Sequence, residues 1–245
     1  MDAGRESNLK LTRAQRIYLV IKYILDFVLA LMAIVVLCPI YLIIALAIVI
    51  DDPGPVIFSQ NRIGAHKKIF KLYKFRTMKV STPHDVPTHL LDHPEQYITR
   101  VGRVLRKTSL DELPQFFNIL FGQLSLCAPR PALYNQYDLI AERDKCGAND
   151  IRPGLTGWAQ INGRDELEIV EKAKLDQYYI EHIGFIMDVK CFFGTFLPVL
   201  FQEGIVEGSH KEENYVSAEA AVIQESEEIY AAESGNVVVQ QQNAG

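Results

Sequence analysis

Residues 27–50 form an apolar stretch that contains no charged side chain. Roughly two dozen apolar residues can cross the ~30 Å hydrocarbon core of a bilayer as one helix. Because lysine and arginine beside a membrane segment favour the cytoplasmic side, basic residues on both flanks predict that both ends lie on that side. These flanking residues are Lys10, Arg13, Arg16 and Lys22 before the stretch, and Arg62, Lys67, Lys68, Lys71, Lys74 and Arg76 after it.

Pro39 lies in the middle of this stretch, directly after Cys38. A proline removes a backbone hydrogen bond and bends a helix. The sequence therefore favours a helix–break–helix over residues 16–50 that enters one leaflet and returns. A kinked transmembrane helix stays open, because prolines are tolerated in membrane helices. Arg13, Arg16 and Lys22 alternate with apolar residues, which predicts an interfacial helix start with basic side chains on the headgroups.

Composition limits the remaining possibilities. The chain has 245 residues, of which 49% are hydrophobic, enough for one core and a membrane element. Its net charge of −5 is not the balance of a nucleic-acid-binding protein. Four scattered cysteines without a CxxC motif predict neither a zinc site nor a disulfide framework, and a reducing compartment is expected. We divide the chain into a polar N-terminus (1–15), the membrane helix (16–50), a cytosolic domain at the membrane surface (51–205) and an acidic, disordered tail (206–245).

The elements expected in the membrane-surface domain are mostly helical. Alternating residues predict two short strands at 56–60 and 69–75 around a turn at 61–64. Residues 132–146 and 165–183 are expected to be helices, and 188–202 an interfacial helix. The fold class is thus mainly α with a small β-hairpin, on a monotopic membrane protein with a re-entrant hairpin. His84, His89 and His93 lie in a proline-rich segment that favours a solvated loop over a metal site.

Asp111 and Glu112 form an adjacent carboxylate pair between basic residues. One interpretation is a capping box, in which Ser109 and Glu112 satisfy backbone N–H groups at a helix start. The other is chemical, because two carboxylates can hold a divalent metal or serve as nucleophile and base. One site can do both, so both interpretations stay open. The basic neighbours are Arg103, Arg106, Lys107 and Arg130.

Further basic residues lie in segments that can present them to an anion. Lys74 and Arg76 are assigned to the second strand. They form either a solvated charged face of the hairpin or a basic surface that faces lipid phosphate or a nucleotide diphosphate. Pro129 and Pro131 stiffen an extended turn that presents Arg130. A glycine- and proline-containing turn at 151–158 can project Arg152 and Trp158, the latter as a base-stacking ring or an interfacial anchor.

Four sequence strings together resemble the bacterial sugar transferase family, the monotopic phosphoglycosyl transferases. They are YKFRTM (73–78), TSLDELPQ (108–115), LSLCAPRP (124–131) and RPGLTGWAQINGR (152–164). Asp176 and Tyr179 fit the next helix of the family, and the resemblance runs from about residue 16 to 205. It implies a re-entrant helix broken at Cys38-Pro39, on the cytoplasmic face of the bacterial inner membrane.

The resemblance also implies a reaction and its residues. A sugar-1-phosphate passes from a UDP-sugar to polyprenyl (undecaprenyl) phosphate and UMP is released, as a first membrane step of exopolysaccharide or glycoconjugate biosynthesis. Asp111 is the implied nucleophile, and Glu112 a base or, with Asp111, a ligand of Mg²⁺. The expected phosphate contacts are Lys74, Arg76, Arg106, Arg130 and Arg152. A non-catalytic membrane anchor and a lipid phosphatase remain as alternatives, and the donor sugar, the glycan and the oligomeric state stay open.

Overall fold

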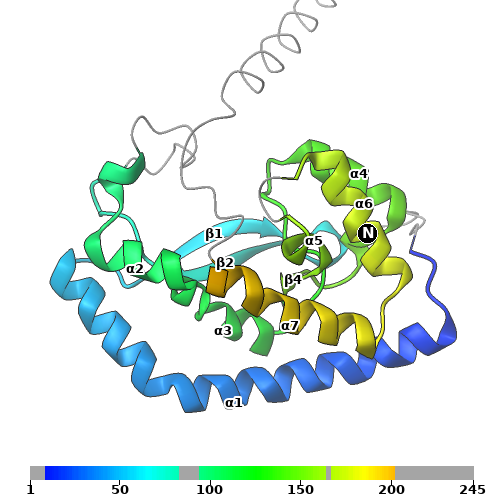
Figure 1. Cartoon of the computed structure of the whole chain (residues 1–245), viewed down its shortest axis with the longest axis horizontal. Helices are drawn as coiled ribbons and strands as arrows, with labels where there is room; N and C mark the ends of the chain where they lie inside the picture. Colours follow the sequence, from blue (N-terminus) through cyan, green and yellow to red (C-terminus); the bar gives the residue numbers. More distant parts are fainter. Residues whose placement is uncertain (1–8, 83–93, 164–166, 202–245) are drawn as a thin grey trace, which may run out of the picture.

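A computed structural model describes residues 9–82, 94–163 and 167–201. The expected histidine loop and acidic tail lie outside these residues, as do the first eight residues. Figure 1 shows the long helix α1 (Arg13–Asp51) as a bent rod, with the other elements on its concave side. In chain order these are β1 (Ile57–Ile63), η1 (Ala65–Lys67), β2 (Ile69–Phe75), η3 (Pro94–Tyr97), α2 (Arg100–Thr108), η4 (Leu110–Glu112), α3 (Gln115–Leu120), β3 (Ser125–Cys127), α4 (Tyr137–Cys146), η5 (Ala148–Asp150), β4 (Gly154–Thr156), α5 (Trp158–Ile161), α6 (Ile169–Glu181) and α7 (Phe185–Phe201).

Helix α1 begins at a capping box, in which the Thr12 hydroxyl accepts from the backbone N–H of Gln15 and the Gln15 side chain accepts from that of Thr12. Among the described residues it is the one helix long and apolar enough to cross a membrane by length and composition. Its buried residues form two groups with a spacing of four, Lys22, Asp26 and Ala30 and then Ile44 and Ile48, so a narrow stripe in each half faces the domain. The rest of its apolar surface is exposed, with Val36 at 74% and Ile50 at 73%.

The helix runs through Cys38 and Pro39 without interruption, so the expected helix–break–helix is not two separate helices. Instead, α1 curves along the half that contains Pro39 (Figure 1). A proline within a helix is a sufficient physical cause for such a bend. Cys38 is exposed on the helix surface.

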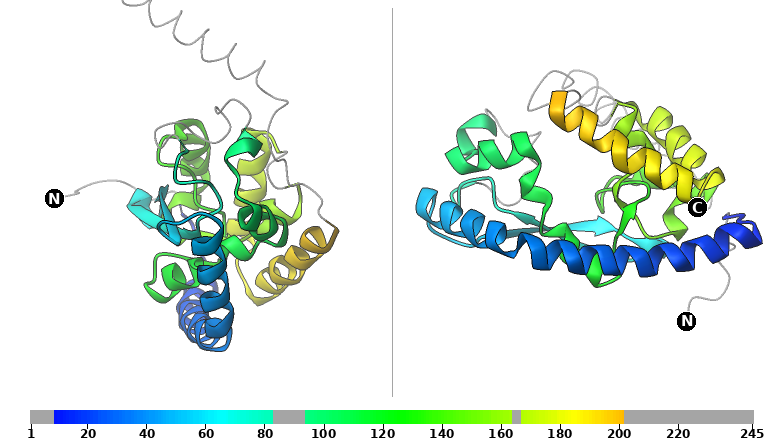
Figure 2. Two further views of the ribbon diagram at one scale, coloured as in Figure 1. Left: turned by 90° about the vertical axis from the view of Figure 1, so that its left-hand side faces the viewer. Right: turned by 60° about the horizontal axis from the view of Figure 1, so that its bottom comes forward.

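Lys22 does not face the lipid headgroups as expected. Its ammonium lies 2.6 Å from a carboxylate oxygen of Asp188, and both side chains are largely buried. Nearby, the Ser125 hydroxyl donates to Asp26 over 2.5 Å. Burying a charge is costly unless it is paired, and these pairs meet that need. The Lys22–Asp188 pair fastens the first half of α1 to the start of α7, which then rises away from it (Figure 2, right), and the Ser125–Asp26 bond fastens it to β3.

The β-hairpin forms where the alternation of residues predicts it, but its turn lies elsewhere. Strands β1 and β2 are antiparallel, with Ile57 opposite Phe75 and Ile63 opposite Ile69. Residues 61–63 therefore continue β1, and the reversal falls at residues 64–68, where His66 and Lys67 have positive φ. Buried Asn118 of α3 holds β2: its side-chain oxygen accepts from the Tyr73 N–H and its nitrogen donates to the Lys71 carbonyl.

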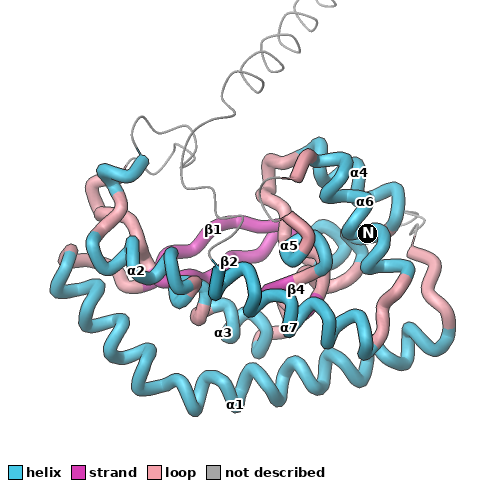
Figure 3. The backbone as a smooth tube through the Cα atoms, in the orientation of Figure 1, coloured by secondary structure: helices cyan, strands magenta, loops and turns pink. Residues whose placement is uncertain are grey.

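The remaining elements are mostly helices around a short parallel pair of strands, β3 and β4 (Figure 3). The mainly helical class with a small hairpin is confirmed, whereas β3–β4 was not expected. Each helix expected after residue 130 is present, although α4 begins at Tyr137 rather than at 132. Trp158 stacks on Tyr178 with ring centroids 5.5 Å apart, so an intramolecular partner occupies the ring expected to meet a base or the interface.

Candidate active site

The carboxylate pair lies on a tight turn between two helices. Helix α2 ends at Thr108, its C-cap Ser109 has a φ of 57° in the left-handed region, and η4 then carries Asp111 and Glu112. The prediction of a capping box at Ser109 and Glu112 is wrong, because Ser109 makes no side-chain cap hydrogen bond to this turn. A capping side chain reaches the next turn from an extended backbone, which Ser109 does not have.

Glu112 is held by two basic side chains from distant segments. The Lys74 ammonium of β2 donates to Glu112 Oε1 over 2.9 Å. The Arg130 guanidinium donates through Nη1 to Oε2 over 3.1 Å and through Nη2 to Oε1. Arg130 also donates to the Leu155 carbonyl over 2.9 Å. Such two-pronged, charge-assisted bonds fix orientation as well as charge.

Asp111 lies beside this arrangement in a different environment. It is 8% exposed, and its Oδ2 lies 3.7 Å from the Lys74 ammonium. Burial raises the pKa of Asp111 above its ordinary value; Lys74, Arg130 and Arg106 counteract part of that rise, and Glu112 adds to it. Burial would also raise the pKa of Glu112, but Arg130 and Lys74 outweigh it and hold this pKa well below the ordinary range. Two adjacent carboxyl groups therefore differ in proton affinity.

A second layer of residues holds the backbone that presents Arg130. The Arg143 guanidinium of α4 donates to the Arg130 carbonyl over 2.9 Å. Arg143 is fixed in turn by the buried Asp176 of α6, whose Oδ2 lies 2.8 Å from its Nε. The Tyr179 hydroxyl donates over 2.7 Å to the Cys127 carbonyl, three residues before Arg130. Asp176 and Tyr179 thus stabilise the segment that presents Arg130.

A polar cavity of about 270 Å³ opens beside Glu112. Lys74 and Arg130 line it together with Arg62 and Lys172, so four basic side chains and one carboxylate share its lining. Such a cavity is suited to an anion that carries more than one negative charge. Sequence reasoning did not place Arg62 and Lys172 at the site. The alternation along β1, had it been extended to Ile63, would have pointed to Arg62.

Of the other expected phosphate contacts, Arg106 lies near the carboxylate pair and Arg76 does not join it. Arg106 Nε donates to the Thr77 hydroxyl over 3.0 Å, and its charge lowers the pKa of Asp111. Arg76 is buried and donates to the Pro55 carbonyl over 2.6 Å and to both the side chain and the backbone of Asp52. It therefore ties the end of α1 to β2.

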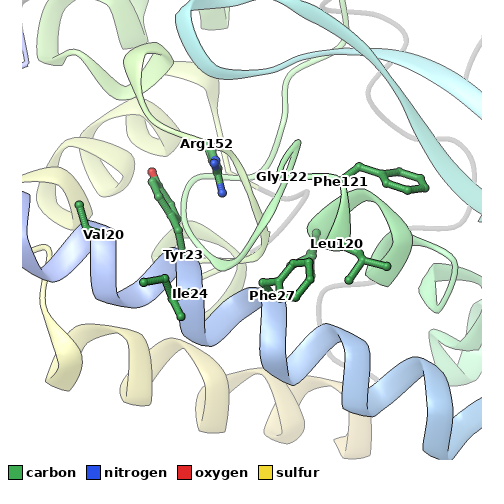
Figure 4. A pocket seen from close by; sticks show the side chains of 9 residues that line it. Val20, Tyr23, Ile24, Phe27, Leu120, Phe121, Gly122 and Arg152 are labelled. Carbon is green, nitrogen blue, oxygen red and sulfur yellow. The ribbon is translucent and has the colours of Figure 1, made fainter.

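Arg152 lies apart from the carboxylate pair, above the first half of α1. Its guanidinium carbon is 4.1 Å from the centroid of the Tyr23 ring, a cation–π contact visible in Figure 4. It lines a different cavity, and the two cavities have no lining residue in common. Further along α1, the Tyr41 hydroxyl donates over 2.6 Å to the carbonyl of Leu113, the residue after Glu112. Helix α1 therefore contacts the residue that follows the acidic turn.

The carboxylate pair could supply one or two protein ligands, but not a full set, for the expected Mg²⁺. Within the described ranges, no three His, Cys, Asp or Glu side chains lie close enough together to form a metal site. Magnesium in phosphate chemistry is commonly held by one or two carboxylates plus substrate phosphates, so a larger cluster is not required. Both oxygens of Glu112 already accept hydrogen bonds, which leaves Asp111 as the better protein ligand.

Comparison with known proteins places this arrangement in a family. The family model described as "Bacterial sugar transferase" matches residues 17–202, which include all but the first four residues of α1, the acidic turn and both cavities. This chain belongs to the bacterial sugar transferase family. The resemblance inferred from the four sequence strings is thereby confirmed.

Individual relatives extend the comparison. The chain is 43% identical over 157 residues to the uncharacterized sugar transferase EpsL of Bacillus subtilis, covering 64% of this chain and 76% of EpsL. It is 42% identical over 178 residues to the UDP-glucose:undecaprenyl-phosphate glucose-1-phosphate transferase of Escherichia coli, covering 69% of this chain and 38% of that protein. A UDP-N-acetylgalactosamine-undecaprenyl-phosphate N-acetylgalactosaminephosphotransferase of Aeromonas hydrophila is 35% identical over 208 residues, covering 82% and 48%. The chain thus spans less than half the length of the latter two.

Proposed function

We propose that this protein transfers a sugar-1-phosphate from a UDP-sugar to undecaprenyl phosphate and releases UMP. The observation that carries the proposal is the buried Asp111 beside a Glu112 held by Lys74 and Arg130, at the edge of a cationic cavity. The names of two relatives describe this class of reaction for those proteins. The sugar remains open, because those two names carry different sugars.

The reaction proceeds in two displacements. A carboxylate oxygen of Asp111 attacks the phosphorus that bears the sugar, the bond to the UMP oxygen breaks, and a phosphosugar is left on Asp111. An oxygen of undecaprenyl phosphate then attacks the same phosphorus and releases the Asp111 carboxylate. Covalent catalysis of this kind lets one site accept a water-soluble and a lipid substrate in turn. Burial raises the pKa of Asp111, and the charge of Lys74 opposes that rise and so favours the ionised nucleophile.

Glu112 has a positioning role in this mechanism. Its lowered pKa makes it a weak base, and its oxygens orient Arg130 and Lys74 toward the cavity. These contacts support positioning over the base role that the family resemblance implied. Phosphoryl transfer depends mainly on placing such charges around the transferred group.

Asp111 and the donor phosphates would hold Mg²⁺, with Glu112 close by. When bound, the ion neutralises part of the charge that gathers on the phosphate oxygens. Lys74, Arg130, Arg62 and Lys172 provide the remaining positive charge around the cavity.

Helix α1 attaches the site to the cytoplasmic face of the inner membrane by entering one leaflet and returning. The phosphate of the lipid acceptor lies at the bilayer surface, so a site beside α1 reaches it without crossing. The exposed apolar surface of α1 and its bend at the half containing Pro39 support this path. Labelling single cysteines introduced before and after α1 in sealed vesicles tests it: both ends should react from the same side, and reaction from opposite sides would exclude re-entry.

UMP release tests the proposed reaction. Purified protein in detergent would receive undecaprenyl phosphate, Mg²⁺ and each of several UDP-sugars, among them UDP-glucose and UDP-N-acetylgalactosamine. We expect UMP from at least one donor with wild type and with the exposed-carboxylate control Glu171→Gln, and none with Asp111→Asn. Full activity of Asp111→Asn would contradict the nucleophile. Free phosphate in place of UMP would favour a lipid phosphatase, and unimpaired cellular function of Asp111→Asn would favour a non-catalytic anchor.

A further inference from the structure

A second cavity, of about 490 Å³, lies between the first half of α1 and the end of α3 (Figure 4). One wall consists of Val20, Tyr23, Ile24 and Phe27, which share one face of α1 because they are spaced by three and four residues. The opposite wall comes from residues 119–122, and Arg152 closes one end. The cavity therefore joins a long apolar wall to a single guanidinium.

The mouth of this cavity is continuous with the apolar outer surface of α1. Val20 is 62% exposed, Ile24 is 60% exposed and Phe121, on the opposite wall, is 63% exposed. Large apolar side chains this exposed on a membrane-type helix face lipid rather than water. A molecule entering from the bilayer would place its apolar part along these residues.

The Arg152 guanidinium is positioned to bind an anion. Its guanidinium stacks on Tyr23, and none of the ion pairs among the described residues involves it. Gly122, with φ of +71°, borders this guanidinium: a Cβ atom there would lie 3.4 Å from Arg152 Nη2, an ordinary contact. Arg152 thus places a partly buried positive charge at the edge of an apolar surface.

We propose that this cavity binds a membrane phospholipid, with its phosphodiester on Arg152 and an acyl chain along the α1 wall. One guanidinium matches the single negative charge of a phosphodiester, and an arginine fork suits phosphate oxygens. The reacting acceptor has to reach Asp111, whose basic neighbours line the other cavity, so it is a poorer candidate for this one. The proposal rests on the membrane attachment of α1 and not on the transferase reaction.

A bound phospholipid would set the depth of the active site. It would join α1 to the residues that follow α3, and α3 begins three residues after Glu112. The phosphate plane of the bilayer would then be fixed relative to the acidic turn, which has to meet the acceptor phosphate at that same level.

Lipid retention, measured by native mass spectrometry, tests the proposal. The measurement needs neither donor nor Mg²⁺, so a negative result would count against the lipid site and not against the proposed transferase reaction. Protein would be delipidated and offered phosphatidylglycerol, diacylglycerol or undecaprenyl phosphate. We expect wild type and Asp111→Asn to retain one phosphatidylglycerol and to discriminate against diacylglycerol, which lacks the phosphate. Arg152→Gln should weaken retention about tenfold, equivalent to about 1.4 kcal/mol. Arg16→Gln, at an exposed arginine of α1 that does not line the cavity, should leave retention unchanged.

A second pair of variants covers the case in which Arg152→Gln does not fold. Ile24→Gln inserts a polar group into the apolar wall, whereas Ile21→Gln changes a similarly exposed residue outside it. Only Ile24→Gln should reduce retention. Equal retention by Ile24→Gln and Ile21→Gln, or of diacylglycerol and phosphatidylglycerol, would overturn the proposal. Preferential binding of undecaprenyl phosphate, lost in Arg152→Gln, would overturn it in favour of the acceptor as occupant.

Discussion

The two terminal nitrogens of Arg130 donate to the two carboxylate oxygens of Glu112, 18 residues earlier in the chain. This pair brings the turn between Pro129 and Pro131 onto the acidic turn of η4. Lys74 approaches the same carboxylate from β2, so three separate segments meet at Glu112.

Arg130→Lys should reduce kcat/KM for UMP release by about 100-fold, the usual scale for removing a positioned charge contact. Lysine keeps the charge but cannot donate two parallel bonds to Glu112 while also reaching the Leu155 carbonyl. Steady-state kinetics would measure the effect, with Arg103→Lys as a control at an exposed arginine. Equal activity of both variants would show that the two-pronged geometry is unimportant.

Lys74→Gln should move the acid limb of the pH profile of kcat/KM to higher pH. Burial already raises the pKa of Asp111 above the ordinary 3.8, and the Lys74 charge opposes that rise. Without it the Asp111 carboxylate gains its proton at a higher pH, and the nucleophile is lost earlier on acidification. Lys71→Gln, an exposed lysine on the same strand, should leave the limb in place. A shift to lower pH in Lys74→Gln would refute this account of Asp111.

Asp176→Asn should destabilise the fold by about 3–5 kcal/mol, because it leaves the buried Arg143 guanidinium without its counter-charge. At roughly 2–4 °C per kcal/mol for a chain of this size, the melting temperature should fall by about 10 °C. The double variant Arg143→Met with Asp176→Leu should lose less, since no charge then remains buried. Thermal unfolding in detergent measures both, with Glu142→Gln as the control for an exposed ion pair. A double variant less stable than Asp176→Asn would contradict this reasoning.

Gly102→Ala should destabilise the protein, while Gly184→Ala should be nearly neutral. A Cβ atom on Gly102 would lie 2.0 Å from the Thr77 carbonyl oxygen, so α2 would have to move away from the strand end. On Gly184 the closest atom would be the His182 carbonyl oxygen at 3.7 Å, an ordinary contact. Melting temperatures of the two variants give the comparison. Similar values would mean that the approach of α2 to Thr77 is not tight in solution.

Local sequence pattern was a good guide wherever neighbouring residues decide the outcome. The uncharged stretch predicted the core of α1, and alternation predicted both strands of the hairpin. Pattern failed where the elements on either side of a motif decide its backbone conformation or its pairing. Ser109 and Glu112 have the spacing of a capping box, but the end of α2 places Ser109 in the left-handed region. The turn at 61–64 was likewise displaced, because β1 continues its pairing with β2 to Ile63.

The basic residues show most clearly what the sequence cannot decide. Arg76, Arg130 and Arg152 all lie in family strings and were expected to share one task. In the structure Arg76 binds next to the end of α1, Arg130 binds Glu112 and Arg152 stacks on Tyr23. Lys22 resembles a headgroup contact in sequence but pairs with Asp188, 166 residues away. A charged side chain binds whichever opposite charge or ring lies nearest in space, and nothing in the local pattern specifies that neighbour.

The sequence by itself determined the long apolar helix, the hairpin, the mainly helical class and, through its four strings, the family and the acidic pair. These follow from hydrophobic periodicity and from residues adjacent in the chain, so they can be read without coordinates. Only the tertiary structure decided which cations meet Glu112, that Asp111 is buried while Glu112 is charge-paired, and that Arg152 belongs to a separate apolar cavity. Those properties depend on distances between segments far apart in the chain, because Coulomb attraction and desolvation act through space and not along the sequence.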